Sequence, residues 1–261
     1  MNATDMLPHG KIASALNVAT AAGRVAMVPF MTAGYPERDG FIDTLREVAR
    51  YGDVVEIGVP FTDPMADGVT IQRSSHAALA NGVSLQWILD ELAAASGINT
   101  PLVLMSYLNP LLAFGFDALA KHAAQAGVCG FIVPDLPYEE SGEFRSALAT
   151  ENLGMIQLVT PATPEARLEK LCAASQGFIY AVTVAGITGG SQDLPVDVTD
   201  YLDRVKSCAS IPVCAGFGVR SAEQVAELGA HADGVIVGSA LVEQLEAGKD
   251  PSIFLQQLVG K

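Results

Sequence analysis

Two carboxylates that lie close together in the sequence could act in acid–base catalysis. Glu56 lies within an otherwise apolar run, 54–59, and Asp67 follows in the turn-rich segment 60–68. A buried carboxylate is costly unless it is paired, neutral or used, and two carboxylates in different surroundings can divide the acid and base roles. The pair therefore predicts proton-transfer chemistry. The alternatives are a structural glutamate bonded to a neighbouring strand and, with equal weight for Asp67, a simple turn residue before Gly68.

Three glycine clusters are of the kind that binds a phosphate group. They lie at 186–190, 216–218 and 238–239, and the last one opens a short helical stretch. Glycine turns and the N-terminus of a helix present backbone N–H groups that bind phosphate without a side-chain charge. No Lys or Arg lies within the clusters, and Arg220 follows the second. The pattern predicts a phosphate site built from backbone, although each glycine alone would be an ordinary turn residue.

The histidines and cysteines give no sign of a metal centre. The four histidines and the four cysteines show none of the spacings of metal ligands or of a disulfide framework. A metal-dependent isomerase or epimerase is therefore disfavoured, and free thiols in a reducing cytoplasm are expected.

Net charge and hydropathy narrow the possible partners. The formal net charge is −14, which argues against nucleic acid and against an anionic membrane surface. We find no basic segment followed by an apolar stretch at the start and no apolar run long enough to cross a bilayer. These features predict a cytoplasmic protein that acts on a small molecule.

A regular alternation of strands and helices must position these residues. Short apolar runs, typical of buried parallel strands, fall at 25–30, 54–59, 102–107, 129–133, 155–159, 178–183, 212–215 and 234–237. Stretches with helical periodicity follow them, at 41–51, 85–95, 116–126, 139–151, 165–174, 198–207, 221–228, 240–246 and 253–259, and an extra helix is expected first, at 11–22. Eight such repeats predict an α/β fold, a single (β/α)8 TIM barrel over residues 1–261.

An open, doubly wound sheet is the alternative fold. A dinucleotide-binding sheet of this kind has a G-x-G-x-x-G turn after its first strand, and segment 31–36 does not contain one. A weak internal echo among 51–58, 127–133 and 231–238 favours the barrel. In a barrel, Glu56 would point into the interior near the C-terminal mouth, because its neighbours along the strand alternate toward the helices.

The residues around the acidic pair resemble a known family. The run 56–68, E-I-G-V-P-F-T-D-P-M-A-D-G, closely resembles the signature of the tryptophan synthase α subunit. Similar segments occur in the same order at 28–34, 104–110, 134–137, 186–189 and 216–219. The resemblance implies a lyase of L-tryptophan biosynthesis that splits indole-3-glycerol phosphate into indole and glyceraldehyde 3-phosphate by retro-aldol chemistry.

The resemblance also implies roles for individual residues. Glu56 matches the acid and base that protonates the indole ring carbon and handles the glycerol hydroxyl proton, Asp67 matches the carboxylate that stabilises the indole nitrogen, and Tyr180 matches a tyrosine beside the glutamate. The phosphate-binding backbone positions that match are Gly189, Gly218, Gly238 and Ser239. The residues that match the indole pocket are Phe30, Leu104, Ile132 and Phe217. Protonating the ring carbon first requires a donor in an apolar slot, where burial favours its neutral form. The two phenylalanines could instead be core residues, and the tyrosine a packing residue.

A partner follows from the same resemblance. It implies no cofactor in this chain and a pyridoxal-phosphate β subunit in an α2β2 heterotetramer. Apolar residues in loops 60–68 and 108–112 predict the docking surface, unless the leucines of 108–112 begin the next helix and pack inward. Three other functions are open: a stand-alone indole-3-glycerol phosphate lyase, a phosphoglycerol prenyltransferase and a catalytically inactive allosteric subunit. Intact Glu56 and Asp67 argue against the last.

Overall fold

Parallel strands close into a barrel in the order in which they occur along the chain. The computed structural model describes residues 7–183, 197–216 and 218–259. Each strand pairs with the next, and β8 pairs with β1. The strands are β1 (Ala26–Thr32), β2 (Val55–Gly58), β3 (Leu102–Met105), β4 (Val128–Ile132), β5 (Gly154–Val159), β6 (Ile179–Val182), β7 (Val213–Gly216) and β8 (Gly234–Val237). The predicted TIM barrel is confirmed, and the open sheet is excluded.

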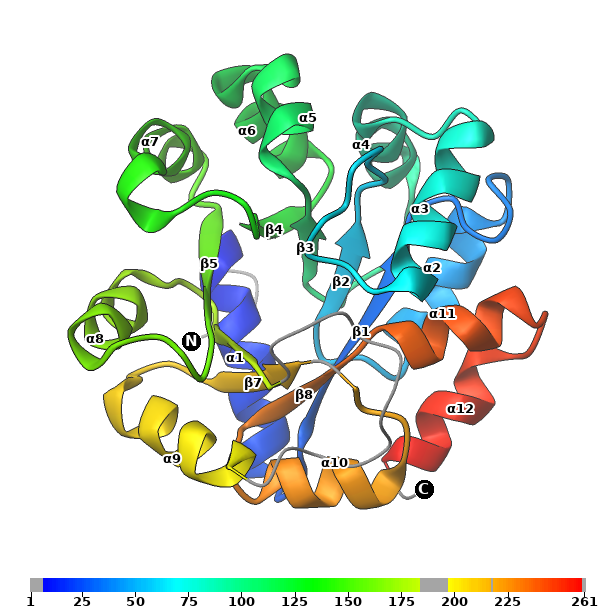
Figure 1. Cartoon of the computed structure of the whole chain (residues 1–261). Coiled ribbons are helices and arrows are strands. Elements are labelled where there is room, and N and C mark those ends of the chain that lie inside the picture. The colour runs from blue at the N-terminus through cyan, green and yellow to red at the C-terminus, as the bar shows by residue number, and fades with distance from the viewer. Residues whose placement is uncertain (1–6, 184–196, 217, 260–261) are drawn as a thin grey trace.

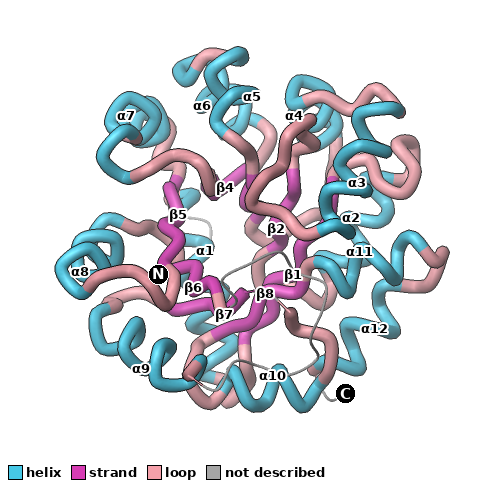
Figure 2. Tube along the Cα trace, viewed as in Figure 1, coloured by secondary structure: helices cyan, strands magenta, loops and turns pink. Residues whose placement is uncertain are grey.

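The helices form a ring around the strands, as Figure 1 and Figure 2 show. They are α2 (Phe41–Ala49), α3 (Val69–Ala80), α4 (Leu85–Ala94), α5 (Leu108–Phe114), α6 (Phe116–Gln125), the 3-10 turn η2 (Tyr138–Glu140), α7 (Gly142–Thr150), α8 (Glu165–Ala174), α9 (Val198–Cys208), α10 (Ala222–Gly229), α11 (Ser239–Glu246) and α12 (Pro251–Leu258). Within the described part of the chain, we find no helix with the length and apolar character that a membrane span requires.

The extra N-terminal helix, α1 (Pro8–Ala21), covers the N-terminal end of the barrel. Its buried face, Ile12, Leu16 and Ala19, recurs every three or four residues and joins the cluster inside the barrel. The backbone N–H of His9 donates to the oxygen of Asn152, which lies two residues before β5. The helix therefore closes the end of the barrel opposite the mouth and keeps water from its interior.

Helix α3 was not expected from the sequence, and α5 was expected only as the alternative that the leucines of 108–112 begin a helix. The residues that α3 buries are Ser74, Ser75 and Ala78, which are small and mostly polar. Such a face produces no apolar periodicity, so the usual signal is missing. Helix α5 is only 7 residues long and contains Pro110 in its first turn, where proline is tolerated. The expected helix at 139–151 is divided into η2 and α7.

The strands alternate between an inner and an outer layer of side chains. Val55 and Ile57 belong to the outer cluster, which packs against the helices. Glu56 pairs in register with Phe30 on β1 and Val103 on β3, and both of these belong to the inner cluster. The prediction that Glu56 faces the barrel interior is therefore confirmed.

Two of the similar segments, 51–58 and 231–238, share a pair of hydrogen bonds just before the strand begins. Before β2, the Asp53 carboxylate accepts from the N–H of Met27 at 2.8 Å, and the N–H of Asp53 donates to the Met27 oxygen at 2.8 Å. Before β8, Asp233 makes the same two bonds with Val213, each at 2.8 Å. Each aspartate thus joins the start of its own strand to the preceding strand, β1 for Asp53 and β7 for Asp233. The repetition in the sequence therefore has a structural cause.

Candidate active site

The Glu56 carboxyl is buried inside the barrel. The residue is 1% exposed, and neither carboxylate oxygen has a partner among the described residues. Burial raises the pKa of Glu56 to about 8, and the charge of Asp67 adds to the rise. Because the charged form is disfavoured, Glu56 is mainly protonated at neutral pH. It is therefore a carboxylic acid ready to give its proton to a group that enters the barrel.

Tyr180 approaches the two carboxylates from β6. Its side chain is 5% exposed, and burial raises its pKa well above the usual value, with the charges of Glu56 and Asp67 acting in the same direction. A Cβ atom on Gly216 would lie 2.4 Å from the Tyr180 ring. Gly216 therefore makes room for this ring, a role that the sequence pattern did not distinguish from phosphate binding.

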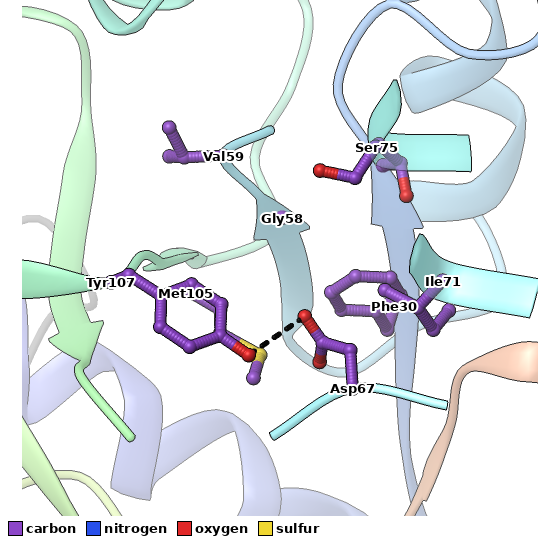
Figure 3. A pocket seen from close by; sticks show the side chains of 9 residues that line it. Phe30, Gly58, Val59, Asp67, Ile71, Ser75, Met105 and Tyr107 are labelled. Atoms are coloured by element: carbon purple, nitrogen blue, oxygen red, sulfur yellow. Dashed lines mark hydrogen bonds between the residues drawn. The ribbon is translucent and has the colours of Figure 1, made fainter. Parts of the chain in front are cut away.

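Asp67 lies at the mouth, between β2 and α3. Its side chain is half-buried, and its Oδ2 accepts from the Tyr107 hydroxyl at 3.1 Å (Figure 3). Burial raises the pKa of Asp67 to about 6, while the hydrogen bond from Tyr107 acts to lower it. At neutral pH Asp67 is therefore mainly ionised, whereas Glu56 is mainly neutral.

Helix α3 holds the segment that carries Asp67. The Ser75 hydroxyl accepts from the N–H of Phe61 at 2.8 Å and donates to the oxygen of the same residue at 3.0 Å. The Gln72 side chain donates to the Asp67 backbone oxygen at 2.9 Å. The N–H of Asp67 also donates to the Pro64 oxygen at 3.1 Å, so the residue does belong to a turn. Asp67 therefore belongs to a turn, and its side chain also lines the pocket.

A pocket opens between Asp67 and the ends of the first three strands. In Figure 3 the Asp67 carboxylate lies between Tyr107 and Phe30. The residues that line the pocket are Phe30, Thr32, Gly58, Val59, Asp67, Ile71, Ser75, Met105 and Tyr107. A Cβ atom on Gly58 would lie 2.5 Å from the Phe30 ring, so this glycine leaves space for the aromatic wall.

One pocket residue expected from the sequence is replaced by its neighbour. Leu104 belongs to the outer cluster and pairs in register with Ile57 and Phe131, which face the helices. The side chain at this strand end that lines the pocket is Met105. Because successive strand residues point to opposite faces, matching the segment one residue out of step selects the wrong side.

The other expected pocket residues have different outcomes. Phe30 lines the pocket, and Ile132 belongs to the inner cluster of the barrel without lining that pocket. Phe217 lies outside the described residues. Tyr107 and Ser75 were missed. Tyr107 ends an apolar run, which is a usual place for a functional side chain in a barrel, whereas Ser75 lies on the helix that gave no periodic signal.

The expected phosphate positions lie at the ends of β7 and β8. Gly238 directly precedes Ser239, the first residue of α11. Gly218 is exposed, follows β7 and has a φ of +86°. Gly189 lies outside the described residues. Arg220 donates two hydrogen bonds to Glu243, at 2.7 and 2.9 Å. The charge of Arg220 is therefore already engaged by Glu243.

No metal site is evident in the described ranges. Among these residues, no group of three or more His, Cys, Asp or Glu side chains is placed to hold a metal ion.

Comparisons with known proteins agree with one another. The family model for the tryptophan synthase alpha chain matches residues 16–259. The chain is 45% identical to the tryptophan synthase alpha chain of Nitratidesulfovibrio vulgaris, over 91% of this chain and 93% of the relative. It is 45% identical to that of Bacillus cereus, over 88% and 90% of the two chains. Among solved structures, it resembles Mycobacterium tuberculosis tryptophan synthase with a TM-score of 0.89 and 36% identity, covering 96% of this chain and 97% of the other.

The burial of Glu56 predicts a stability cost that depends on pH. Since the pKa is 4.5 for a free glutamate and about 8 in the fold, the folded state holds a proton that the unfolded state releases between these values. Stability therefore falls as pH rises through this window, and Glu56→Gln removes the effect. We expect the variant to be more stable than the wild type by about 3 kcal/mol near pH 7, with almost no difference below about pH 4.

Urea unfolding across this pH range measures the difference. Glu140→Gln, at an exposed glutamate, is the control and should change stability by no more than about 0.5 kcal/mol. A stability difference for Glu56→Gln that does not vary with pH would contradict a neutral Glu56.

Proposed function

The chain belongs to the tryptophan synthase alpha chain family, the lyase subunit that cleaves indole-3-glycerol phosphate in tryptophan biosynthesis, and we propose that Glu56 and Asp67 carry that cleavage. The observation that carries the proposal is the contrast between the two carboxyls. Burial keeps Glu56 neutral, while Asp67 at the mouth remains mainly ionised. The site thus holds a proton donor and a negative charge side by side, as the reaction requires.

The first step is protonation of the indole ring. The ring is a poor leaving group as a carbanion, so the carbon that bears the glycerol chain must first receive a proton. Glu56 donates that proton, and the ring becomes an indolenine-like cation with its charge centred on nitrogen. The Asp67 carboxylate accepts a hydrogen bond from the ring N–H and stabilises the developing charge. Enclosure of Glu56 in the apolar interior strengthens both effects.

The second step breaks the carbon–carbon bond. The electron pair of that bond returns to the ring and neutralises the cation. The hydroxyl on the adjacent chain carbon loses its proton to the Glu56 carboxylate, and this carbon becomes the aldehyde of glyceraldehyde 3-phosphate. Indole leaves with the proton that Glu56 gave, and Glu56 is protonated again. The proton balance closes without any other acid or base.

The surrounding residues orient the substrate for these steps. Phe30 and Met105, which line the pocket, offer apolar walls for the indole ring. Tyr180, beside Glu56, fits a role in holding the chain hydroxyl. The phosphate is assigned to the backbone of Gly218, Gly238 and Ser239, where α11 begins, and to Gly189 by resemblance. The proposal thus assigns the two ends of the substrate to different strands of the same mouth.

Membership of the family implies a β subunit as partner, and pyridoxal phosphate belongs to that subunit rather than to this chain. We assign the docking surface to the loop 60–68 and to residues 108–112 in an α2β2 assembly. Residues 108–112, which were expected to form a loop, begin helix α5. Met65 is 86% exposed, and Leu112 on α5 is 52% exposed. Leu111 is fully buried, so the leucines of 108–112 are divided between packing and the surface.

We also assign the enzyme to the cytoplasm. The four cysteines are all free thiols, as a reducing compartment favours.

Removal of either carboxylate should abolish most of the cleavage. Glu56→Gln should lower kcat by at least about 10²–10⁴-fold, with glycerol 3-phosphate binding unchanged. For Asp67→Asn, the ratio of wild-type to variant kcat/KM should be large and constant above about pH 7. The ratio should fall toward one as Asp67 becomes protonated in the wild type, below its pKa of about 6.

The ratio cancels the titration of the substrate phosphate, which is common to both proteins. A ratio that stays constant from pH 5 to pH 8, or substantial turnover by Glu56→Gln, would contradict the assigned roles.

Phosphate binding should depend on Gly238 more than on Arg220. A Cβ atom on Gly238 would meet Phe30 only at 3.7 Å, so Gly238→Ala preserves packing but obstructs the approach of an anion. We expect glycerol 3-phosphate affinity to fall at least about tenfold, equivalent to one lost hydrogen bond to a charged group. Arg220→Ala should change it by less than about threefold, since this charge is engaged by Glu243.

The matched control is Gly142→Ala, which introduces a Cβ into open space at the first residue of α7. Isothermal titration with glycerol 3-phosphate measures all three variants. A larger loss for Arg220→Ala than for Gly238→Ala would show that the site relies on a side-chain charge.

Docking of the β subunit should require the exposed apolar side chains of Met65 and Leu112. We expect Met65→Glu and Leu112→Glu to weaken β-subunit binding and its stimulation of cleavage by about tenfold or more, as expected for apolar anchors of an interface. Val18→Glu is the control, because Val18 is 65% exposed on α1 at the opposite end of the barrel. Titration with a β variant that cannot consume indole provides the measurement. Equal effects of all three changes, or no stimulation by the wild-type pair, would favour a stand-alone lyase.

A further inference from the structure

The Tyr107 hydroxyl lies where two segments of the mouth meet. Tyr107 follows β3 and is 5% exposed. Its ring stacks on Phe61 of the segment after β2, with centroids 5.0 Å apart and an angle of 23° between the planes. The side chain is therefore fixed in direction by packing and does not rely on its hydroxyl for its position.

Two hydrogen bonds fix the direction of the hydroxyl proton. The backbone N–H of Ala66 donates to the Tyr107 oxygen at 2.8 Å. The hydroxyl has a single proton, and because the N–H group occupies a lone pair of the oxygen, that proton is left for the Asp67 carboxylate. The distance from the Tyr107 oxygen to Asp67 Oδ2 is 3.1 Å. Tyr107 thus gives its proton to the carboxylate that borders the pocket.

The backbone beside Tyr107 is held from the other side as well. The N–H of Leu108, the first residue of α5, donates to the Asp135 carboxylate at 2.9 Å. Asp135 follows β4, so two neighbouring connections support the tyrosine. A donor held in place before the substrate arrives requires no reorganisation during the reaction.

We propose that Tyr107 is a positioning residue, whose hydroxyl orients the Asp67 carboxylate and keeps it in its charged form. The inference rests on the proposed role of Asp67. One Asp67 oxygen is occupied by Tyr107, so the rest of the carboxylate is directed to the ring N–H of the substrate. A carboxylate at the mouth without this donor would rotate freely and would accept a proton more readily.

The other described groups around Asp67 do not stabilise its negative charge, so the Tyr107 hydroxyl must offset the effect of burial on its pKa. Glu56 from β2 and Tyr180 from β6 face Asp67, and Asp135 acts on Tyr107 from the connection after β4. None of these groups is a cation. Burial raises the pKa of Asp67, and the bond from Tyr107 is the influence that lowers it. Loss of the hydroxyl therefore moves protonation of Asp67 to higher pH.

Tyr107→Phe in the full chain tests the proposal, because it keeps the stacked ring and removes only the hydroxyl. We expect kcat/KM at pH 7 to fall by about 10-fold to 100-fold, the effect of a hydrogen bond to a charged group. The loss should be mainly in kcat, and the acid limb of the pH profile should move to higher pH. Glycerol 3-phosphate affinity should remain within about twofold, since no contact at the phosphate end changes.

Tyr201→Phe is the matched control. Tyr201 on α9 is also 5% exposed and donates its hydroxyl proton to the Val159 oxygen at 2.8 Å, away from the two carboxylates. It should lose stability to a similar degree without any movement of the pH profile. An equal movement in both variants would overturn the proposal, because the effect would then be one of general stability.

A double-mutant cycle separates this inference from the proposed function. In an Asp67→Asn background, Tyr107→Phe should cost less than about twofold, since a residue that acts through Asp67 has nothing left to position. Equal costs in both backgrounds, or an unmoved acid limb, would overturn the role of Tyr107 while Asp67 keeps its own. An active Asp67→Asn variant would instead overturn the proposed function.

Discussion

Burial of the Glu56 carboxyl is the constraint on which the rest of the site depends. A carboxyl that is 1% exposed and without a hydrogen-bond partner in the described structure is held neutral by its apolar surroundings. Those surroundings exist only because the sheet closes on itself and α1 covers its far end. The same enclosure that destabilises the fold keeps Glu56 protonated at neutral pH, so stability is opposed to the acid role that we propose for this residue.

The second carboxylate is kept charged by a different placement. Asp67 lies on a connection at the mouth, where it is only half-buried and receives the Tyr107 hydroxyl proton. Helix α3 supports this connection through Ser75 and Gln72. A strand position and a loop position therefore give two similar side chains opposite protonation states. The barrel provides both positions within and directly after a single strand, which explains how so short a run contains both carboxylates.

Much of this arrangement could be predicted because its signals are local. Apolar runs marked each strand, and alternation within β2 placed Glu56 inside the barrel. Helix α3 was missed because it buries serines, and α5 was expected only as an alternative because it is short and contains proline. Leu104 was assigned to the pocket in place of Met105, since one residue of offset along a strand reverses the face. In each case, the hydropathy of the local sequence did not distinguish the observed structure from the expected one.

The sequence by itself determined the barrel, the family and the two carboxylates, because these depend on periodicity and on a long contiguous signature. Only the tertiary structure decided their protonation states, since burial and through-space hydrogen bonds set a pKa. It also decided that Tyr107 meets Asp67 across 40 positions of sequence and that Gly216 makes room for Tyr180. Contacts of this kind join segments that are distant along the chain, and closure of the barrel is the physical event that brings them together.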